Sequence, residues 1–347
     1  FIDYYGSLLA AIVVNQNLES ADFLFELSYA HTEPTPTPRV KSIMNPALII
    51  NPSAGRGISS RVVKQLAEVT ASWPEPPDLI YTAGPGDGMT VAAQLRQRGC
   101  PLVVACGGDG TVHEVVNGLF LSESSSPLPL FSFIPLGTGC DTARSLHLPN
   151  NPYTILRQLP AGRVVPIDVG KITFQTSRKR ERNRYFINDI NVGLGPLVAK
   201  RAKHPLLSWM GGSAYTIGTA IELLKPLYFP LKLQVDDQPW QDFDTFNLSI
   251  CNGHYFGGGM KPCSEAGLTS GKLEALHIGP ITTLEGFRYM KPIMSGREVN
   301  HPAIRIFSFS SLQIEGAEVE FETDGEIPGI TPMKITLIPR ALRVNIG

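Results

Sequence analysis

The sequence predicts an α/β protein with an N-terminal open α/β domain and a C-terminal, mainly antiparallel β-sandwich domain. The chain has 347 residues, more than one compact core usually holds. From residue 46 to about residue 150, a short apolar run, a glycine-bearing turn and a helical pattern follow one another four times. After about residue 166, short β-like runs take over. We therefore expect an appendage over 1–40, an α/β domain over 41–165 and a β-rich domain over 166–347, and we leave open whether the C-terminal end returns to the α/β domain.

The α/β domain is predicted from the spacing of its apolar residues. The runs ALII, DLIY, LVVAC and LFSFI are short and apolar, and each is followed by a turn that contains glycine. Helical spacing follows over 59–72, 88–99 and 111–121 and again from Asp141. Ligands bind beyond the carboxyl ends of the strands in such sheets, so the turns NPSAGRG, CGGDGT and PLGTG should converge on one edge.

The β-rich domain is predicted from runs such as VVPIDVGKITF, YFINDINVGLG, FNLSICN and KITLIPRALRV. One helical stretch, about 212–225, interrupts them. The basic stretch SRKRERNR (177–184) lies between two such runs and indicates an exposed hairpin loop. We expect Asp168, Asn188, Asp189 and Asn191 to make structural hydrogen bonds within these strands, with a place on the wall of a cleft as the alternative.

Composition excludes several classes of protein. The chain is 43% hydrophobic and 18% charged, which is too apolar for a disordered protein, and its net charge of −1 gives no general attraction to nucleic acid. The five cysteines are scattered without CxxC spacing, so we expect reduced thiols, no zinc and a cytoplasmic protein. The most apolar early run, LLAAIVV, is too short to cross a bilayer.

The stretch GGDGT at 107–111 has the chemistry of a phosphate-binding turn. Glycines let backbone N–H groups approach a bulky anion, and the N-terminus of the following helix favours negative charge. Asp109 would repel phosphate on its own, so it requires either a Mg²⁺ ion between the two groups or a role in ordering the loop. The chain has no GxxxxGK[ST], which makes a P-loop ATPase improbable, and no dinucleotide GxG fingerprint after the first strand.

The order ALIINPSAGRG, CGGDGTVHEVVNGL, FIPLGTGCDTARSL, CNGHYFGGGMKP and TDGE resembles the diacylglycerol kinase catalytic-domain family. That family includes the bacterial soluble lipid kinases and is related to sphingosine and ceramide kinases. The resemblance spans about residues 46–344. It implies transfer of the γ-phosphate of ATP, with Mg²⁺, to a lipid hydroxyl in a cleft between the two domains.

The resemblance also assigns roles by position. Glu326 would accept the proton, and Asp324 would share that role or order the metal, although TDGE also reads as an ordinary β-turn. Asp109 of GGDGT is the third catalytic candidate. The residues expected against the nucleotide are Asn51, Pro52, Ser53, Ala54, Gly55, Thr82, Gly107, Gly108, Asp109, Gly110, Thr111, Val112, His113 and Thr138. From its chemistry alone, His113 is expected to cap or pack rather than to catalyse.

Two positions depart from the family pattern. Cys140 replaces the asparagine of GTGND, and a thiol is a much weaker hydrogen-bonding group than an amide. Ser270 replaces an aspartate that helps to hold a structural Mg²⁺ in the bacterial lipid kinases, while Gly267 and Lys272 fall at the neighbouring ligand positions. We therefore expect that structural metal to be absent and the Mg²⁺ that travels with ATP to remain.

The sequence thus favours an ATP- and Mg²⁺-dependent lipid kinase that converts diacylglycerol to phosphatidate. Its partners would be a lipid alcohol and the inner face of the membrane, touched peripherally and with the basic hairpin as one candidate contact, but not nucleic acid. The oligomeric state stays open, with a homodimer as one option. Two alternatives also stay open: an NAD-kinase-like phosphorylation of a soluble substrate, and a non-catalytic relative that binds nucleotide or lipid.

Overall fold

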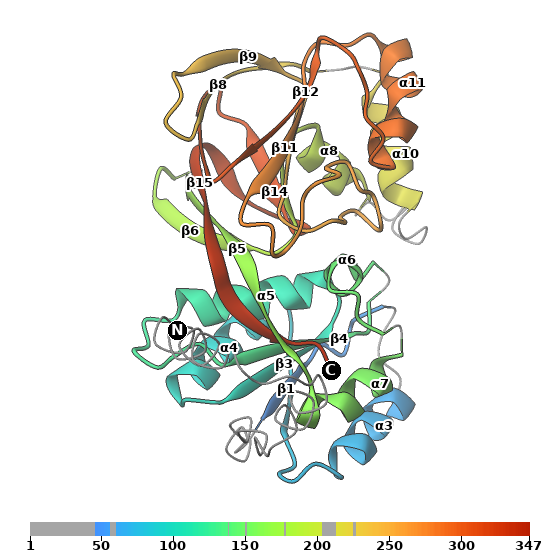
Figure 1. The fold of residues 1–347 in the computed structure, drawn as a ribbon, viewed down its shortest axis with the longest axis vertical. Coiled ribbons are helices and arrows are strands. Elements are labelled where there is room, and N and C mark those ends of the chain that lie inside the picture. The colour runs from blue at the N-terminus through green and yellow to red at the C-terminus, as the bar shows by residue number, and fades with distance from the viewer. Residues whose placement is uncertain are drawn as a thin grey trace, which may run out of the picture. The chain divides into compact units, whose positions relative to one another are not determined.

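The computed structural model of the protein describes residues 46–55, 60–137, 139–149, 151–176, 178–202, 213–224 and 227–347. The expected appendage over 1–40 and the candidate nucleotide contact Thr138 lie outside these residues. Residues 43–347 form one compact unit, which Figure 1 shows as two lobes.

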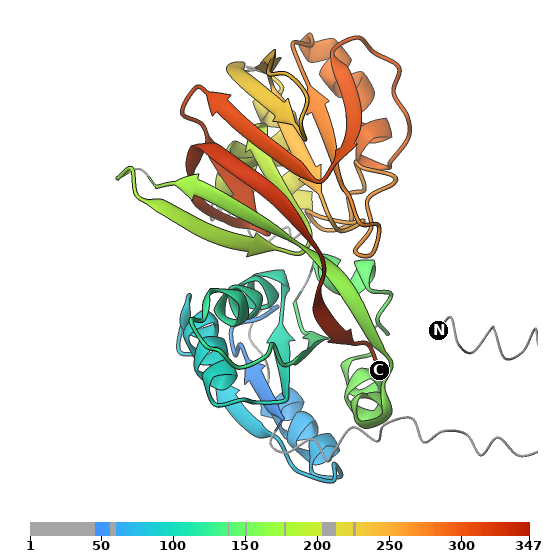
Figure 2. The same ribbon diagram turned by 60° about the vertical axis from the view of Figure 1, so that its left-hand side comes forward.

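The first lobe is built on parallel strands in the order β4–β3–β1–β2. Its elements are β1 (Ala47–Ile50), α3 (Ser60–Thr70), β2 (Asp78–Tyr81), α4 (Asp87–Gln97), β3 (Leu102–Gly107), α5 (Asp109–Leu121), β4 (Leu130–Pro135), α6 (Asp141–Ser145), α7 (Pro152–Gln158) and the 3₁₀ turn η1 (Leu159–Ala161). Helices α4 and α5 pack together, as do α3 and α7, and the two pairs cover opposite faces of the sheet (Figures 1 and 2). This arrangement confirms the predicted open α/β domain.

The second lobe is a set of antiparallel strands with helices on its flank, of which the described residues include α8, α10 and α11. Its elements are β5 (Val164–Gln175), β6 (Glu181–Phe186), β7 (Asp189–Gly193), α8 (Leu194–Ala202), α10 (Ser213–Glu222), β8 (Phe229–Val235), β9 (Gln241–Thr245), β10 (Asn247–Cys251), β11 (Leu273–Ile278), α11 (Thr283–Met294), β12 (Ile304–Phe309), β13 (Ser311–Gly316), β14 (Glu320–Thr323) and β15 (Glu326–Asn345). Neighbouring strands follow the order β12–β11–β10–β7–β14–β15. A second series, β13, β8 and β9, also starts from β15. The β-rich prediction is confirmed, but it missed α8 and α11.

A missed capping signal explains the omission of α11. The segment begins Thr282-Thr283-Leu284-Glu285, and the Thr282 hydroxyl accepts the backbone N–H of Glu285 while the Glu285 carboxylate accepts the backbone N–H of Thr282. This reciprocal arrangement is the capping box, a helix start that can be read from sequence.

A two-stranded ribbon joins the lobes. Strands β5 and β15 pair antiparallel over most of their length, from Ile330↔Gln175 in the second lobe to Asn345↔Val164 in the first. At its far end β15 pairs in parallel with β4, at Val344↔Phe131. The last strand of the chain therefore completes the sheet of the first lobe, and it passes beside β5 in both views (Figures 1 and 2).

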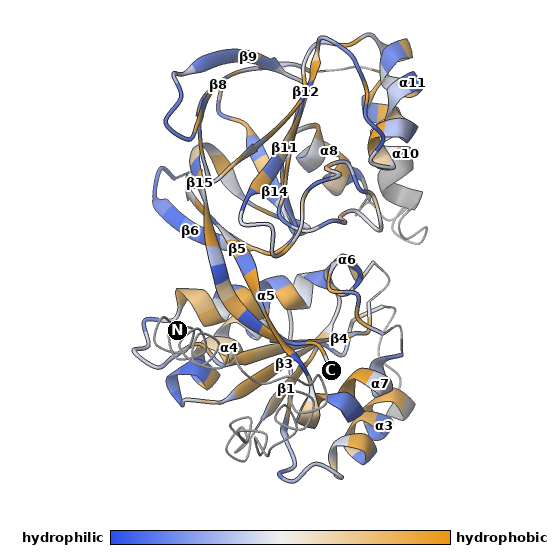
Figure 3. Ribbon diagram, viewed as in Figure 1, coloured by the Kyte–Doolittle hydropathy of each residue, from blue (hydrophilic) through white to orange (hydrophobic). Residues whose placement is uncertain are grey.

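Each lobe has its own apolar core. In the first lobe, β1 and β3 are buried at every position, and Figure 3 shows them hydrophobic along their length. The core of the second lobe includes the buried side chains of Phe174, Phe186, Phe309 and Phe321. A smaller core lies beneath α11 and includes Leu223, Phe246 and Ile281. None of the helices in the described part of the chain is long and apolar enough to cross a bilayer.

Candidate active site

A cleft of about 900 Å³ is lined by residues of both lobes. At one end lie the turns that follow β1, β3 and β4, represented by Gly55, Gly108 and Gly137. These are the turns that the sequence predicts to converge. The opposite end is apolar and is formed by the second lobe.

The first two turns are tied together through Asn51 and Thr111. The Asn51 side-chain amide donates to the Thr111 hydroxyl (3.0 Å), and its carbonyl oxygen accepts the backbone N–H of Ser53 (2.9 Å). Gly107 is required beside them, because a Cβ there would lie 2.2 Å from the Thr111 Oγ1 atom. Gly108 and Gly110 line the cleft at the start of α5, and neither has a side chain to keep a ligand from the backbone there.

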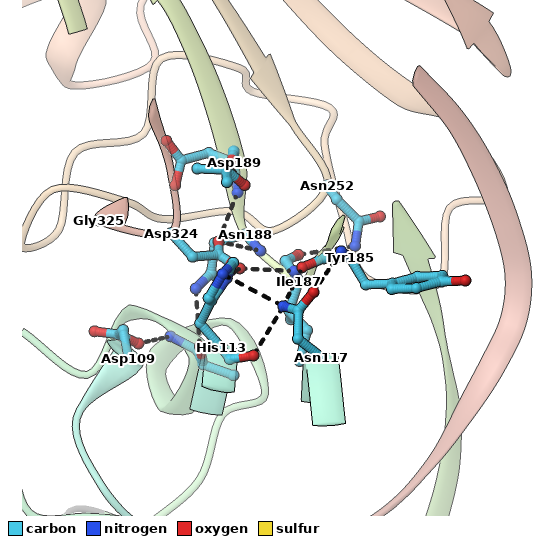
Figure 4. Close-up of polar contacts among 12 residues, drawn as sticks. Asp109, His113, Asn117, Tyr185, Ile187, Asn188, Asp189, Asn252, Asp324 and Gly325 are labelled. Carbon is cyan, nitrogen blue, oxygen red and sulfur yellow. Dashed lines mark hydrogen bonds and ion pairs between the residues drawn. The ribbon is translucent and has the colours of Figure 1, made fainter. Parts of the chain in front are cut away.

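Asp109 orders the neighbouring turn. Its carboxylate accepts the backbone N–H groups of Asp141 (3.0 Å) and Thr142 (2.9 Å), which are the first two residues of α6 (Figure 4). A carboxylate at this point also complements the positive end of the helix. The sequence suggests that Asp109 either contacts Mg²⁺ or orders the loop. These hydrogen bonds support the ordering of the loop, and Asp109 also lines the cleft.

Cys140, the departure from the family pattern, occupies the cap position of α6 without capping it. Its backbone is left-handed (φ 51°), and its thiol donates to the Gly137 carbonyl oxygen at 3.3 Å. Burial, with Asp109 nearby, raises the pKa of this thiol to about 11. The capping that an asparagine would give here comes instead from Asp109.

Glu114, in α5, holds the turn before α4 and was missed from sequence. Its Oε1 accepts the backbone N–H of Gly86 (2.7 Å), and its Oε2 accepts that of Gly88 (2.9 Å). Glu114 lines the cleft together with Gly84 and Pro85 of that turn. The signal available in the sequence was a carboxylate one turn into the helix that follows GGDGT.

Asp324 joins the lobes. Its Oδ1 accepts the backbone N–H groups of Asn188 (3.0 Å) and Asp189 (3.1 Å), and its Oδ2 accepts that of Ile187 (3.1 Å). Oδ2 also lies 3.3 Å from Nδ1 of His113, on α5 (Figure 4). Asp324 is buried, and its carboxylate contacts four donors or potential donors. These contacts direct the carboxylate at the protein rather than at a substrate.

The same helix makes a second connection between the lobes. The Asn117 side chain donates to the Tyr185 carbonyl oxygen (2.8 Å) and accepts the Tyr185 backbone N–H (2.9 Å), one turn beyond His113 (Figure 4). Both contacts reach the β6–β7 region, so α5 places the GGDGT turn against the second lobe.

Glu326 follows in the same turn and has the opposite character. Asp324 and Gly325 have positive φ (45° and 90°), as an Asp-Gly hairpin turn requires, and Thr323 pairs with Glu326 across it. Glu326 is exposed and lies on the cleft wall. Burial lowers the pKa of the Arg184 guanidinium, and the nearby Glu326 carboxylate acts in the opposite direction. Of the two carboxylates of TDGE, Glu326 is therefore the exposed one.

Asp189, Asn191 and Glu322 form a polar group in the middle of the cleft. The Asn191 amide donates to Asp189 Oδ2 (2.6 Å) and to Glu322 Oε2 (2.9 Å), and its carbonyl oxygen accepts the Ser249 hydroxyl (2.6 Å). Burial, and then Glu322, raises the pKa of Asp189 well above its usual range. The expected structural hydrogen bonds are present, but Asn188, Asp189 and Asn191 also line the cleft.

The structure brings most of the predicted site residues to the cleft. Those that line it are Asn51, Ser53, Ala54, Gly55, Thr82, Gly108, Asp109, Gly110, Thr111, Asp324 and Glu326. Pro52, Gly107, Val112 and His113 do not line it among the described residues. Val112 and His113 are buried because they face inward on α5, and Gly107 is the last residue of β3, packed against Thr111.

The loop expected to have lost its metal is held by hydrogen bonds. The Ser270 hydroxyl donates to the Lys272 carbonyl oxygen (2.7 Å), and the Ser270 backbone N–H donates to the Gly267 carbonyl oxygen (2.9 Å). Asp168 accepts the backbone N–H of Gly271 (2.7 Å) and that of Arg340 (2.8 Å), which anchors the loop to β15. The absence of a structural metal here stays a prediction.

The cleft wall is acidic. Its carboxylates are Asp109, Glu114, Asp141, Asp189, Glu322, Asp324 and Glu326, and no lysine, arginine or histidine is among the described residues that line it. No group of three or more histidine, cysteine, aspartate or glutamate side chains in the described part of the chain is arranged to hold a metal by itself. An anionic ligand would therefore need to bring cations with it, and oxygen donors are the ligands that Mg²⁺ prefers.

The apolar end of the cleft lies between β10, β11, α8, α10 and α11. Its walls include Leu194, Leu223, Phe246, Leu276, Tyr289 and Ile293. A cleft with glycine turns at one end, carboxylates between and an apolar chamber at the other is suited to phosphoryl transfer to an amphipathic alcohol.

Comparison with known proteins agrees with this architecture. A family model described as "Diacylglycerol kinase catalytic domain" matches residues 45–172, and one described as "YegS C-terminal NAD kinase beta sandwich-like domain" matches residues 188–346. A protein named "Probable lipid kinase YegS-like" from Chromohalobacter salexigens is 32% identical over 246 residues, covering 70% of this chain and 72% of that protein. A protein named "Diacylglycerol kinase" from Staphylococcus saprophyticus is 25% identical, covering 82% of this chain and 90% of that one.

Solved structures show the same fold. A structure described as "Crystal structure of a putative diacylglycerol kinase from Bacillus anthracis str. Sterne" superposes with a TM-score of 0.70 at 25% identity, covering 87% of this chain and 97% of that one. The fold and the site define a two-lobed kinase of the phosphotransferase class. The chain belongs to the YegS-like family of lipid kinases, which share the diacylglycerol kinase catalytic domain.

Proposed function

We propose that this protein transfers the γ-phosphate of ATP, bound with Mg²⁺, to the hydroxyl of diacylglycerol and so produces phosphatidate. The observation that carries the proposal is the exposed carboxylate of Glu326, placed on the cleft wall between the glycine turns and the apolar chamber. A lipid in the chamber would present its head group at this carboxylate, and a nucleotide on the turns would present its phosphates from the other side.

The glycine turns would bind the nucleotide phosphates through backbone N–H groups at the start of α5. Asp109, on the wall at that end, would face the Mg²⁺ ion with the lone pairs that its bonds to the start of α6 leave unused, and the phosphates would supply other oxygen ligands. When bound, the ion neutralises charge on the transferred phosphoryl group. Glu326 would accept the proton of the attacking hydroxyl, which leaves Asp324 to hold the turn in place.

The acidic wall also constrains the acceptor. Asp189 and Glu322 lie in the middle of the cleft, where a lipid head group would pass, and no basic side chain of the described lining balances them. Burial favours the neutral form of Asp189, but a phosphodiester would still meet the other carboxylates of the cleft wall, and like charge is costly in a partly desolvated site. This favours an uncharged head group such as the glycerol of diacylglycerol over phosphatidylglycerol.

We further propose that the enzyme works at the inner, cytoplasmic face of the membrane, where ATP is present. This proposal rests on the scattered cysteines of the sequence, which have no CxxC spacing.

The test is transfer of radiolabelled γ-phosphate from ATP to diacylglycerol in mixed micelles with Mg²⁺. Glu326→Gln should lower kcat by about 10²- to 10⁴-fold. EDTA should abolish transfer, and phosphatidylglycerol should remain unlabelled. Label on NAD instead would replace the proposal by the soluble-substrate alternative. Nucleotide binding without label on any acceptor would favour a non-catalytic relative.

A further inference from the structure

We propose that the ends of α10 and α11 form a membrane-docking surface that seats the apolar end of the cleft on a bilayer containing anionic lipid. The docking patch consists of Ile221, Leu224, Leu227, Tyr228, Leu284 and Phe287. The inference rests on the proposed function in one respect: a lipid acceptor has to pass from a bilayer into the cleft.

Exposed apolar surface is concentrated at this patch. In the described part of the chain, ten large hydrophobic side chains are exposed, and six of them belong to the patch. Leu284 is 78% exposed, Leu224 62% and Leu227 55%. Side chains of this size, gathered together rather than scattered singly, mark an interaction surface.

Two contacts join the parts of the patch. The Tyr228 hydroxyl donates to the Ile281 carbonyl oxygen (2.7 Å), which fixes the segment after α10 near the start of α11. A Cβ on Gly286 would lie 2.5 Å from Leu223 Cδ2, so α11 packs against the residue that follows α10. Figure 1 shows α10 and α11 side by side on the flank of the second lobe.

The two faces of α11 separate the cleft from the outside. Gly286, Tyr289, Met290 and Ile293 share one face by their 3- and 4-residue spacing, and all of them line the cleft. Residues 284, 287, 288 and 291 share another face, and all four are exposed. A helix that is apolar towards the cleft and also carries exposed leucine and phenylalanine lies at the boundary between substrate site and bilayer.

Charge on the outer face of α11 identifies the bilayer as the occupant. Leu284 and Phe287 are followed on that face by Arg288 and Lys291, neither of which forms an ion pair with a carboxylate among the described residues. The acidic neighbour, Glu285, is engaged by Thr282 and by His301. Apolar side chains flanked by unpaired basic ones match the acyl region and the anionic headgroups of a membrane surface.

The experiment is co-sedimentation of the full-length protein with two kinds of vesicle, phosphatidylcholine alone and phosphatidylcholine with 30% phosphatidylglycerol, an assay that needs no catalysis. The change is Leu224→Asp with Leu284→Asp, and Trp240→Asp is the matched control. Trp240 is 40% exposed in the turn between β8 and β9, at the opposite end of β8 from Tyr228. The double variant should lose at least about tenfold in partition coefficient on both vesicles, and the control less than about twofold.

A second variant tests the charge component. Arg288→Glu with Lys291→Glu should weaken binding to the anionic vesicles by at least about tenfold and binding to phosphatidylcholine much less. All these side chains are exposed, so circular dichroism melting should be unchanged and each comparison refers to folded protein.

Several outcomes would overturn the docking surface. These are a wild type that binds neither vesicle, a double variant that binds as wild type does, and a control that loses as much as the double variant. A double variant that changes only the oligomeric state in light scattering would assign the patch to a second copy of the chain. Transfer to a monomeric short-chain diacylglycerol separates the two proposals: its absence in a wild type that binds vesicles through the patch refutes the proposed function alone.

Discussion

The two carboxylates of TDGE give the sharpest test of how this site is built. Asp324→Asn replaces Oδ2 by an NH₂ group when the remaining oxygen keeps its bonds to the backbone of Asn188 and Asp189. The buried N–H of Ile187 then faces another donor and loses its acceptor. Glu326→Gln, two residues away, changes an exposed group that stands on the cleft wall.

The magnitudes follow from these contacts. Leaving the Ile187 N–H buried without an acceptor costs about 1–3 kcal/mol, and turning two charged hydrogen bonds into neutral ones costs about 1 kcal/mol each. Asp324→Asn should therefore lower the free energy of unfolding by about 3–5 kcal/mol. Glu326→Gln should change it by less than about 0.5 kcal/mol, as is usual for an exposed position, while kcat falls by about 10²- to 10⁴-fold.

The assay pairs urea unfolding, followed by tryptophan fluorescence, with phosphoryl transfer measured well below each unfolding midpoint. Folded Asp324→Asn should retain much more of the wild-type kcat than Glu326→Gln. The reasoning would be refuted by an Asp324→Asn protein as stable as wild type within about 1 kcal/mol and as inactive as Glu326→Gln. In that case Asp324 would be the proton acceptor and its four contacts incidental.

Three further predictions concern other parts of the molecule. Burial lowers the pKa of His277 from 6.5 to about 4, so the unfolded chain takes up this proton first as the pH falls. The free energy of unfolding should therefore drop by about 2 kcal/mol between pH 7 and pH 5. In urea titrations, His277→Gln should remove this pH dependence. Glu114→Ala frees the turn before α4 and should raise the KM for ATP by about tenfold with a smaller change in kcat, in steady-state kinetics with saturating lipid. Gly107→Ala forces a Cβ into Thr111 and should cost about 1–3 kcal/mol in chemical unfolding, whereas Gly110→Ala, which has open space around it, should cost nothing; equal effects would mean that the Thr111 contact is unimportant.

Much of the fold was predictable because its signals are local. The four strands of the first lobe are short apolar runs closed by glycine turns, and their helices repeat apolar residues every three to four positions. The helix α11 was missed although its capping residues, Thr282 and Glu285, stand at the expected spacing. Its apolar residues divide between the cleft and the exposed patch, so they do not form the single stripe by which helices are recognised.

The candidate site was predictable only where one motif supplies its own partners. Asp109 and the glycine turns could be placed from sequence, since the edge of a parallel sheet gathers them. Glu322 and Asn191 could not, because they come together only through the pairing of β14 with β7. Asp324 differs from Glu326 because it accepts hydrogen bonds from the backbone N–H groups of residues 187–189. No residue pattern in the sequence predicts these bonds.

The parallel pairing of β15 with β4 has a consequence for synthesis on the ribosome. The sheet that carries the glycine turns is closed by residues near 344, which leave the ribosome after every other strand of that sheet. The first lobe is therefore short of a strand until β15 has emerged, and its β4 edge stays open until then. Nucleotide should bind only to chains that include β15, and removal of residues 338–347 should abolish binding although every glycine turn remains.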